Sequence, residues 1–167
     1  IHPEAETLPR KQEYVNIAVH ELAHYWFGDY VTMTWWDDTW LNEALGEWSD
    51  MNITEAAEPT WRFRDTRFRL SEQAMNADEK LSSHAIRRPV VSKTDIEASF
   101  DGEITYAKGA SVFRMLEAFV GRDVWRKFIH DYLAKHAWGN ASADDFIADM
   151  TGQLGAPIAD AFKTFLD

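Results

Sequence analysis

The sequence predicts a mainly α-helical fold. Apolar residues recur every three or four positions in two neighbouring segments, residues 15–26 and 41–48, as one face of a helix requires. Helix-start signals follow in the last third of the chain, where Ser142 precedes Asp144 and Asp145, and where Pro157 suits a first helical turn. Only residues 31–36 alternate β-branched and aromatic side chains, and this run predicts no more than a loop or a short extended piece.

Proline, glycine, aspartate and serine residues mark where the predicted elements begin and end. The length of 167 residues is typical of one domain, and we treat residues 1–167 as a single one. Two prolines indicate an extended lead-in over residues 1–10, Gly28 stops the first helix, and Asp37 or Asp38 is placed to cap the second. The remaining expectations are a helical run that starts at Pro59, an irregular stretch over residues 76–101, and helices over 106–120, over 123–136, from Ser142 and from Pro157.

Charge and cysteine content narrow the class of protein. The chain has 28 acidic and 17 basic residues and a net charge of -11, which opposes binding to nucleic acid or to an anionic membrane surface. It contains no cysteine, so disulfides and cysteine-ligated zinc sites are excluded. No apolar run approaches the roughly 20 residues that cross a bilayer, and no segment resembles a signal peptide. The chain starts at Ile1 rather than Met, so we expect it to be part of a longer protein, with its cellular location undetermined.

A metal-binding pattern lies in the first helical segment. His20, Glu21 and His24 form an HExxH box, and residues four apart on a helix lie one turn above each other on one face. Both imidazoles can therefore reach one ion, with the Glu21 carboxylate beside it. Eighteen residues, 25 to 42, separate His24 from Glu43, which is the candidate third ligand. A hydrolytic zinc site uses three protein ligands and one open position, so the pattern predicts a single zinc ion held by His20, His24 and Glu43.

The alternative for these histidines is a helix in which they only pack or cap. An apolar stripe at helical spacing argues against this alternative, because burial of the stripe would leave the two histidines and Glu21 largely outside the core. The stripe comprises Val15, Ala18, Val19, Leu22 and Trp26.

Arginines alternate with aromatic residues in the run that follows Pro59. They occupy positions 62, 64, 67 and 69. We interpret them as a solvated helix face whose arginine stems cover aromatic rings. A site for acidic groups of a substrate is the alternative.

Three segments together carry a family resemblance. They are HELAHYWFGDYVTMTWWDDTWLNE, then ITYAKGASVFRMLEAFVG some sixty residues later, and then HAWGNASADDF. This combination resembles the zinc aminopeptidase family that includes aminopeptidase N and leukotriene A4 hydrolase, from about Val15 to about Asp145. The resemblance implies a zinc peptidase that removes N-terminal residues from peptides, with Glu21 as general base and Tyr106 as hydrogen-bond donor to the tetrahedral intermediate.

The resemblance also implies which part of the family's fold is present. We expect the helical lobe of a thermolysin-like zincin catalytic domain, with the upstream mixed α/β lobe absent. The partners it implies are a peptide with a free N-terminus and the remaining domains of the parent protein, which would dock on an exposed apolar surface. Alone, such a fragment can be inactive.

The chain departs from the family pattern in two places. No Gly-x-Met-Glu-Asn signature, whose Glu helps to hold the α-amine of the substrate, precedes the zinc box. The usual NEGFA is replaced by NEALGE, with Ala44 for Gly. Glu47 lies one turn past Glu43; it is either a partner of the metal ligands or an exposed residue, and we favour the exposed position. Gly46 costs stability inside a helix and indicates close packing against a neighbour.

Two other functions remain open. A thermolysin-like endopeptidase shares HExxH and a downstream NEA sequence, although its spacing to the glutamate is one residue longer and it lacks WFG and TYAKG. A non-catalytic helical module of a larger assembly is the other alternative, and the intact ligands and base argue against it.

Overall fold

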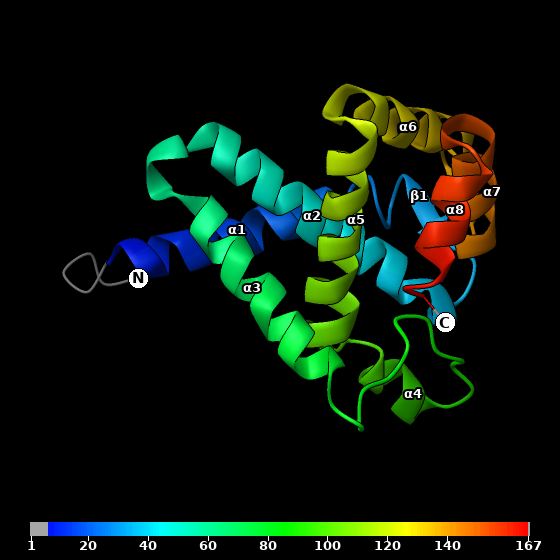
Figure 1. Cartoon of the computed structure of the whole chain (residues 1–167), viewed down its shortest axis with the longest axis horizontal. Coiled ribbons are helices and arrows are strands. Elements are labelled where there is room, and N and C mark those ends of the chain that lie inside the picture. The colour runs from blue at the N-terminus through cyan, green and yellow to red at the C-terminus, as the bar shows by residue number, and fades with distance from the viewer. Residues whose placement is uncertain (1–6, 167) are drawn as a thin grey trace.

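A computed structural model describes residues 7–166 of the chain, and these residues are mainly α-helical, as predicted (Figure 1). Two three-residue strands, β1 (Val31–Met33) and β2 (Gly139–Ala141), pair in parallel with Val31 opposite Gly139. Short helical turns occur at η2 (Trp36–Asp38), η3 (Pro59–Trp61) and the π-helical η4 (Gly102–Lys108). The α-helices are α1 (Leu8–Ala23), α2 (Thr39–Ala57), α3 (Phe63–Asp78), α4 (Lys93–Ala98), α5 (Gly109–Val120), α6 (Arg122–Lys135), α7 (Ala143–Leu154) and α8 (Ala156–Lys163).

Helix α2 runs through the middle of the molecule and packs against both α1 and α5 (Figure 1). Its approach to α5 is close, because a Cβ atom added at Gly109 would lie 2.6 Å from the Cβ of Ala44. The missing side chain at Gly109 therefore leaves room for Ala44, where the resembling family usually has glycine. Helices α7 and α8 lie on the other side of α5 from α3, and α6 crosses the C-terminal end of α5 (Figure 1).

The core is an aromatic cluster centred on Phe113 of α5. Its ring contacts Trp40 of α2 at a centroid distance of 6.3 Å and Trp125 of α6 at 5.8 Å. It also meets Phe146 of α7 at 5.9 Å and Phe162 of α8 at 5.6 Å. One side chain thus joins four other helices, and burial of such large apolar rings is the main stabilising contribution to this half of the fold.

Two helix starts agree with the predictions from the sequence. Ser142 begins α7 with a reciprocal capping box, in which its hydroxyl accepts from the Asp145 backbone N–H and the Asp145 carboxylate accepts from the Ser142 backbone. Helix α8 has Pro157 in its first turn, where the missing N–H is not needed.

Other boundary predictions are wrong. Leu8 to Arg10 are helical rather than extended, since Pro9 also lies in a first turn; the first six residues of that predicted lead-in lie outside the described part of the chain. The stretch from 76 to 101 is mostly irregular, as predicted, but it also contains the short helix α4, which the Ser92 hydroxyl caps. Asp38 stands at the start of α2 but does not cap it, because its carboxylate accepts from the Ala143 backbone N–H at 2.9 Å.

The apolar stripe predicted to be buried on the first helix is largely exposed. Leu22 and Trp26 are 50% and 51% exposed, whereas the buried residues of α1 are His20 and Ala23. The reason is that α2 packs on the face that carries His20. Apolar side chains consequently face solvent along the rest of α1, among them Leu8 and Ile17.

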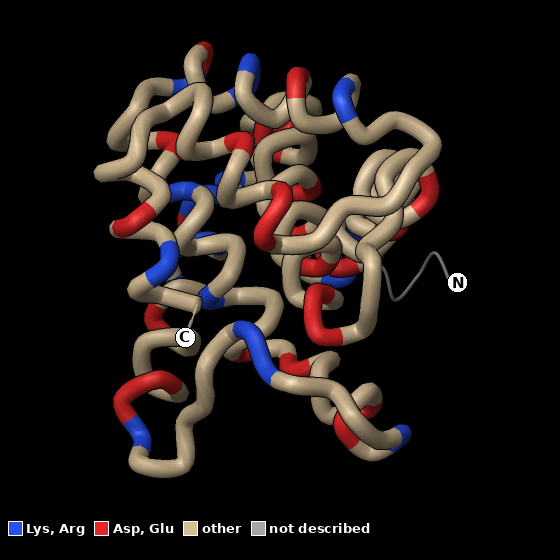
Figure 2. The backbone as a smooth tube through the Cα atoms, turned by 90° about the vertical axis from the view of Figure 1, so that its right-hand side faces the viewer, with Lys and Arg blue, Asp and Glu red and all other residues tan. Residues whose placement is uncertain are grey.

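Acidic residues outnumber basic ones over the fold, and both kinds are spread along the whole chain (Figure 2). Among the described helices, none combines the length and the apolar content that a membrane span needs.

Replacement of Phe113 by alanine tests the central role of the aromatic cluster. Phe113 is completely buried, so Phe113→Ala is expected to lower the free energy of unfolding by about 3 to 5 kcal/mol through lost burial and a residual cavity. Phe119 on the same helix is 76% exposed, and Phe119→Ala is expected to change stability little. Urea titrations of the two variants make the comparison; equal losses would contradict the assignment of the core.

Candidate metal centre

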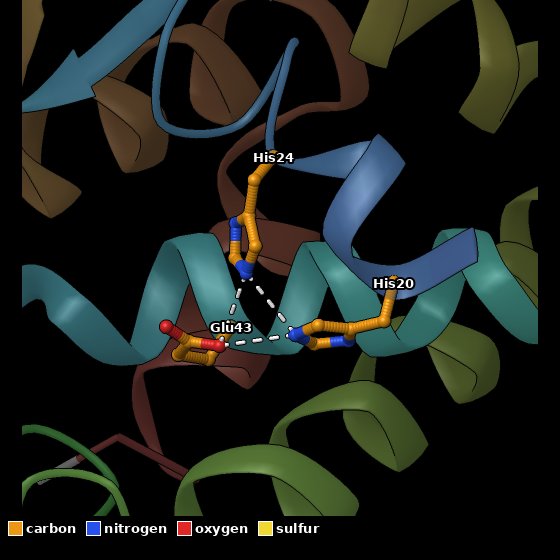
Figure 3. Close-up of side chains that lie close together, drawn as sticks. All are labelled: His20, His24 and Glu43. Carbon is orange, nitrogen blue, oxygen red and sulfur yellow. Dashed lines mark hydrogen bonds and ion pairs between the residues drawn. The ribbon is translucent and has the colours of Figure 1, made fainter. Parts of the chain in front are cut away.

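Three side chains from α1 and α2 converge on one point (Figure 3). His20 lies in the last turn of α1, and His24 immediately follows the helix. The Nε2 atoms of the two histidines are 3.1 Å apart, and Glu43 Oε2 lies 3.2 Å from His20 Nε2 and 3.4 Å from His24 Nε2. The structure therefore brings together the three residues that sequence spacing selected.

These separations suit a small tetrahedral ion. Zinc lies about 2.0 to 2.1 Å from nitrogen and oxygen ligands, so two ligands of a tetrahedral site are about 3.3 to 3.4 Å apart. The three observed separations are close to this value. Two imidazole nitrogens and one carboxylate oxygen also form a donor set of the kind that catalytic zinc sites use.

The other ring nitrogen of each histidine has a partner of its own. His24 Nδ1 lies 2.9 Å from the Phe27 carbonyl oxygen, a contact that requires a proton on Nδ1 and so leaves Nε2 free to bind a metal. His20 Nδ1 is 3.7 Å from both Glu47 Oε2 and Asp50 Oδ2, which is within ion-pair range although no hydrogen bond forms. Such outer partners orient metal-binding imidazoles and increase their basicity.

Glu47 is therefore not exposed, contrary to the prediction. Its side chain is only 12% accessible because α1 covers it where His20 crosses α2. Asp50 was not selected from the sequence, although its spacing from Glu43 and Glu47 could have shown that it lies on the same face of α2. Glu43, Glu47 and Asp50 follow at intervals of four and three, which places all three carboxylates on one face of α2.

Gly46 allows the His20 ring to lie directly on α2. A Cβ atom at this position would come within 3.0 Å of His20 Cε1 and 3.3 Å of His20 Nδ1. The sequence predicted that Gly46 packs closely against a neighbour. That neighbour is the imidazole of His20, a candidate metal ligand.

The electrostatic environment favours positive charge at this point. Burial alone would lower the pKa of His20, but the carboxylates of Asp50 and Glu43 outweigh it and raise the pKa to about 10. Burial would raise the pKa of Glu43, but the two imidazoles lower it to about 2. Burial raises the pKa of the fully enclosed Asp50 to about 7. The site thus stabilises a cation among its carboxylates.

Tyr106 lies beside the three converging side chains, and Glu21 follows His20 on α1, where its charge acts on Tyr106. The ring of Tyr106 stacks on that of His20, with centroids 5.7 Å apart and planes inclined by 27°. Burial raises the pKa of the Tyr106 hydroxyl, and the negative charges of Glu43 and Glu21 raise it further, which keeps the phenol protonated. Glu21 is exposed, so its carboxylate is accessible from solvent.

A π-helical turn presents Tyr106 to the site. Asp101 starts η4 by accepting hydrogen bonds from the Glu103 and Ile104 backbone N–H groups, at 2.9 and 2.7 Å. Widened turns of this type are frequent at functional sites. The sequence predicted an ordinary helix from Tyr106, and the π-helical geometry has no simple sequence signal.

The fold and the converging side chains define a helical protein with a candidate metal centre of the HExxH type, and comparison with known proteins places it in a family. Residues 1–165 match the Peptidase family M1 domain, and the chain belongs to that family. It is 34% identical to Aminopeptidase N of Lactobacillus delbrueckii subsp. lactis, with 100% of this chain and 20% of that protein covered. It is 36% identical to Glutamyl aminopeptidase of Bos taurus, over 98% of this chain and 17% of that protein. The chain spans about a fifth of the length of these relatives.

Replacement of Gly46 tests whether the geometry of His20 controls metal binding. Gly46→Ala is expected to displace the imidazole and to lower zinc affinity by about tenfold or more, the usual scale for a disturbed ligand orientation. In α7, a Cβ atom at Gly152 would meet nothing within 4 Å, so Gly152→Ala is the matched control and should leave affinity unchanged. Competition with a chromogenic chelator measures both. Equal affinity in the two variants would rule out this role for Gly46.

Proposed function

We propose that the chain is the metal-binding part of the catalytic domain of a zinc aminopeptidase, which hydrolyses N-terminal residues from peptides. The observation that carries this proposal is the convergence of His20, His24 and Glu43 at separations suited to one tetrahedral ion, within a chain of peptidase family M1. One zinc ion per chain would be held by these three side chains. When bound, zinc supplies Lewis acidity that activates water and polarises a carbonyl group.

The residues around the metal would divide the remaining chemistry. The carboxylate of Glu21, fixed next to His20 by the helix, would accept a proton from the attacking water and pass it to the leaving amine. The hydroxyl of Tyr106 stays protonated and would donate a hydrogen bond to the carbonyl oxygen as it becomes negative. Glu47 and Asp50 would hold the His20 ring in place.

The preference for a free N-terminus is supported by the names of the relatives, which are aminopeptidases. It is tested in the complete protein with an aminoacyl reporter that carries a free amine, set beside the same reporter with an acetylated amine. Cleavage of the free form alone is expected. Equal cleavage of both would exclude an aminopeptidase and favour a thermolysin-like endopeptidase.

The remaining domains of the parent protein are the proposed partners of this chain. The exposed apolar side chains of Ile17 and Leu22 on α1, and of Tyr25 just after it, give such domains a surface to pack against. The 167-residue chain alone is expected to bind zinc but to turn over substrate poorly, because substrate positioning by the rest of the active-site cleft is worth several kcal/mol of barrier.

Replacement of Glu21 tests the assignment of the general base. In the complete protein, Glu21→Gln should keep zinc bound and lower turnover by about 10²- to 10⁴-fold, since the amide cannot accept the proton. Glu13→Gln, at an exposed position of the same helix, is the control and should be fully active. Steady-state kinetics and metal analysis give the two readouts. Normal turnover by Glu21→Gln would show that Glu21 is not the general base.

Replacement of Tyr106 tests the proposed hydrogen bond to the substrate oxygen. Tyr106→Phe should lower turnover by roughly 10²- to 10³-fold with little change in metal content, because only the hydroxyl is lost. Tyr14→Phe removes an exposed hydroxyl from α1 and should have no such effect. Unchanged turnover in Tyr106→Phe would show that another group stabilises the oxygen.

A further inference from the structure

A second site of chemical interest lies at the C-terminal end of α2, away from the candidate metal centre. A cavity of about 600 Å³ opens there between α2, α3 and α5. Arginines from several elements line it together with two glutamates: Arg64, Arg67, Arg114, Arg122, Glu55 and Glu117. We call it the arginine cavity. None of the three candidate metal ligands, and neither Glu21 nor Tyr106, lines it.

Two of these guanidinium groups are held side by side and largely buried. Arg67 donates to the Met51 carbonyl oxygen at 2.8 Å, and Arg114 donates to the sulfur of the same residue at 3.1 Å. Arg114 is also anchored by the hydroxyls of Ser71 and Ser111, at 3.1 and 2.7 Å. Both groups are therefore ordered before any ligand arrives, which reduces the entropy lost on binding.

The carboxylates of the cavity do not balance this positive charge. Glu55 pairs with both Arg67 and Arg64, and Glu117 pairs with Arg122 at 3.7 Å. Within residues 7–166, no carboxylate lies within 4 Å of Arg114. Four arginines but only two glutamates line the cavity, and the charge of Arg114 is partly offset by Glu47 and Asp50, which do not line it.

The hydrogen-bond donors and the positive charges of the two inner arginines, Arg67 and Arg114, are not fully matched by their neighbours. Arg67 Nε is buried with no hydrogen-bond partner among the described residues. Burial lowers the pKa of Arg114 to about 10, and the neighbouring charge of Arg67 adds to this effect, while Glu47, Asp50 and Glu117 oppose it only in part. Two like charges held together away from water are costly, and an anion between them would offset that cost.

We propose that the arginine cavity is a binding site for a compact oxyanion of the phosphate type. A phosphate anion would pair with the guanidinium donors of Arg67 and Arg114 that the two lining glutamates leave over. Its oxygens would accept paired hydrogen bonds from guanidinium groups, which present donors in the fork geometry that phosphate prefers. The sequence predicted that the arginines after Pro59 form a solvated helix face. This prediction fits Arg64, which lies at the exposed mouth of the cavity, but not Arg67, which is enclosed.

Calorimetric titration of the whole, metal-free chain with inorganic phosphate tests the proposal, with ionic strength matched by sodium chloride. Saturable binding of one phosphate per chain is expected, with a dissociation constant on the order of 1 mM. Arg67→Gln should weaken it at least tenfold. Arg69→Gln, on the same helix but outside the cavity, removes the same charge and should leave binding unchanged.

A gain of affinity gives an independent test. Glu55→Gln removes the carboxylate that competes for Arg67 and should tighten phosphate binding several-fold. Arg122 is a half-exposed residue at the mouth of the cavity, so Arg122→Gln should leave the fold intact. It should weaken phosphate binding by about threefold. Circular dichroism verifies that each variant is folded. Absence of saturable binding by the native chain, or equal losses in Arg67→Gln and Arg69→Gln, would overturn the proposal. If Arg67→Gln does not fold, unchanged affinity in both Glu55→Gln and Arg122→Gln would overturn it.

Discussion

The close contact between α1 and α2 at Gly46 determines the rest of the site. The imidazole of His20 lies on α2 at a point where a Cβ atom would come within 3.0 Å of the ring and crowd it. This contact sets the distance between the two helices, and that distance brings His20 and His24 on one helix within reach of Glu43 on the other. It also explains why a glycine, which weakens a helix by about 1 kcal/mol relative to alanine, stands in the middle of α2.

The same contact creates a buried cluster of opposite charges. One imidazole meets Glu43 on one side and both Glu47 and Asp50 on the other. Asp50 has no exposed surface, and neither of its carboxylate oxygens has a hydrogen-bond partner among residues 7–166. Buried carboxylates without hydrogen bonds are costly, so a cation bound by the neighbouring ligands would stabilise this part of the fold. Arg114 contributes positive charge from the other direction, and it also forms a wall of the arginine cavity.

The sequence was sufficient for the predictions that depend on short and regular spacing. The HExxH box and the gap to Glu43 select three residues that the structure brings together. Ser142 was predicted to begin a helix, and it caps α7. It was insufficient where the outcome depends on which face of a helix meets a neighbour. Leu22 and Trp26 were predicted to be buried because they form an apolar stripe, but periodicity cannot show that α2 covers the opposite face. The prediction for Glu47 failed for the same reason. The π-helical turn before Gly109, which presents Tyr106, depends on local packing that no residue pattern announces.

The measurement that tests the central claim most directly is a zinc titration of the native chain beside single substitutions of the three converging residues. The account predicts one zinc ion per native chain. It also predicts that His20→Gln, His24→Gln and Glu43→Gln each lower zinc affinity by about 100-fold or more, because each leaves only two protein ligands. A native chain that binds no zinc, or variants that bind it as tightly as the native chain, would contradict the account.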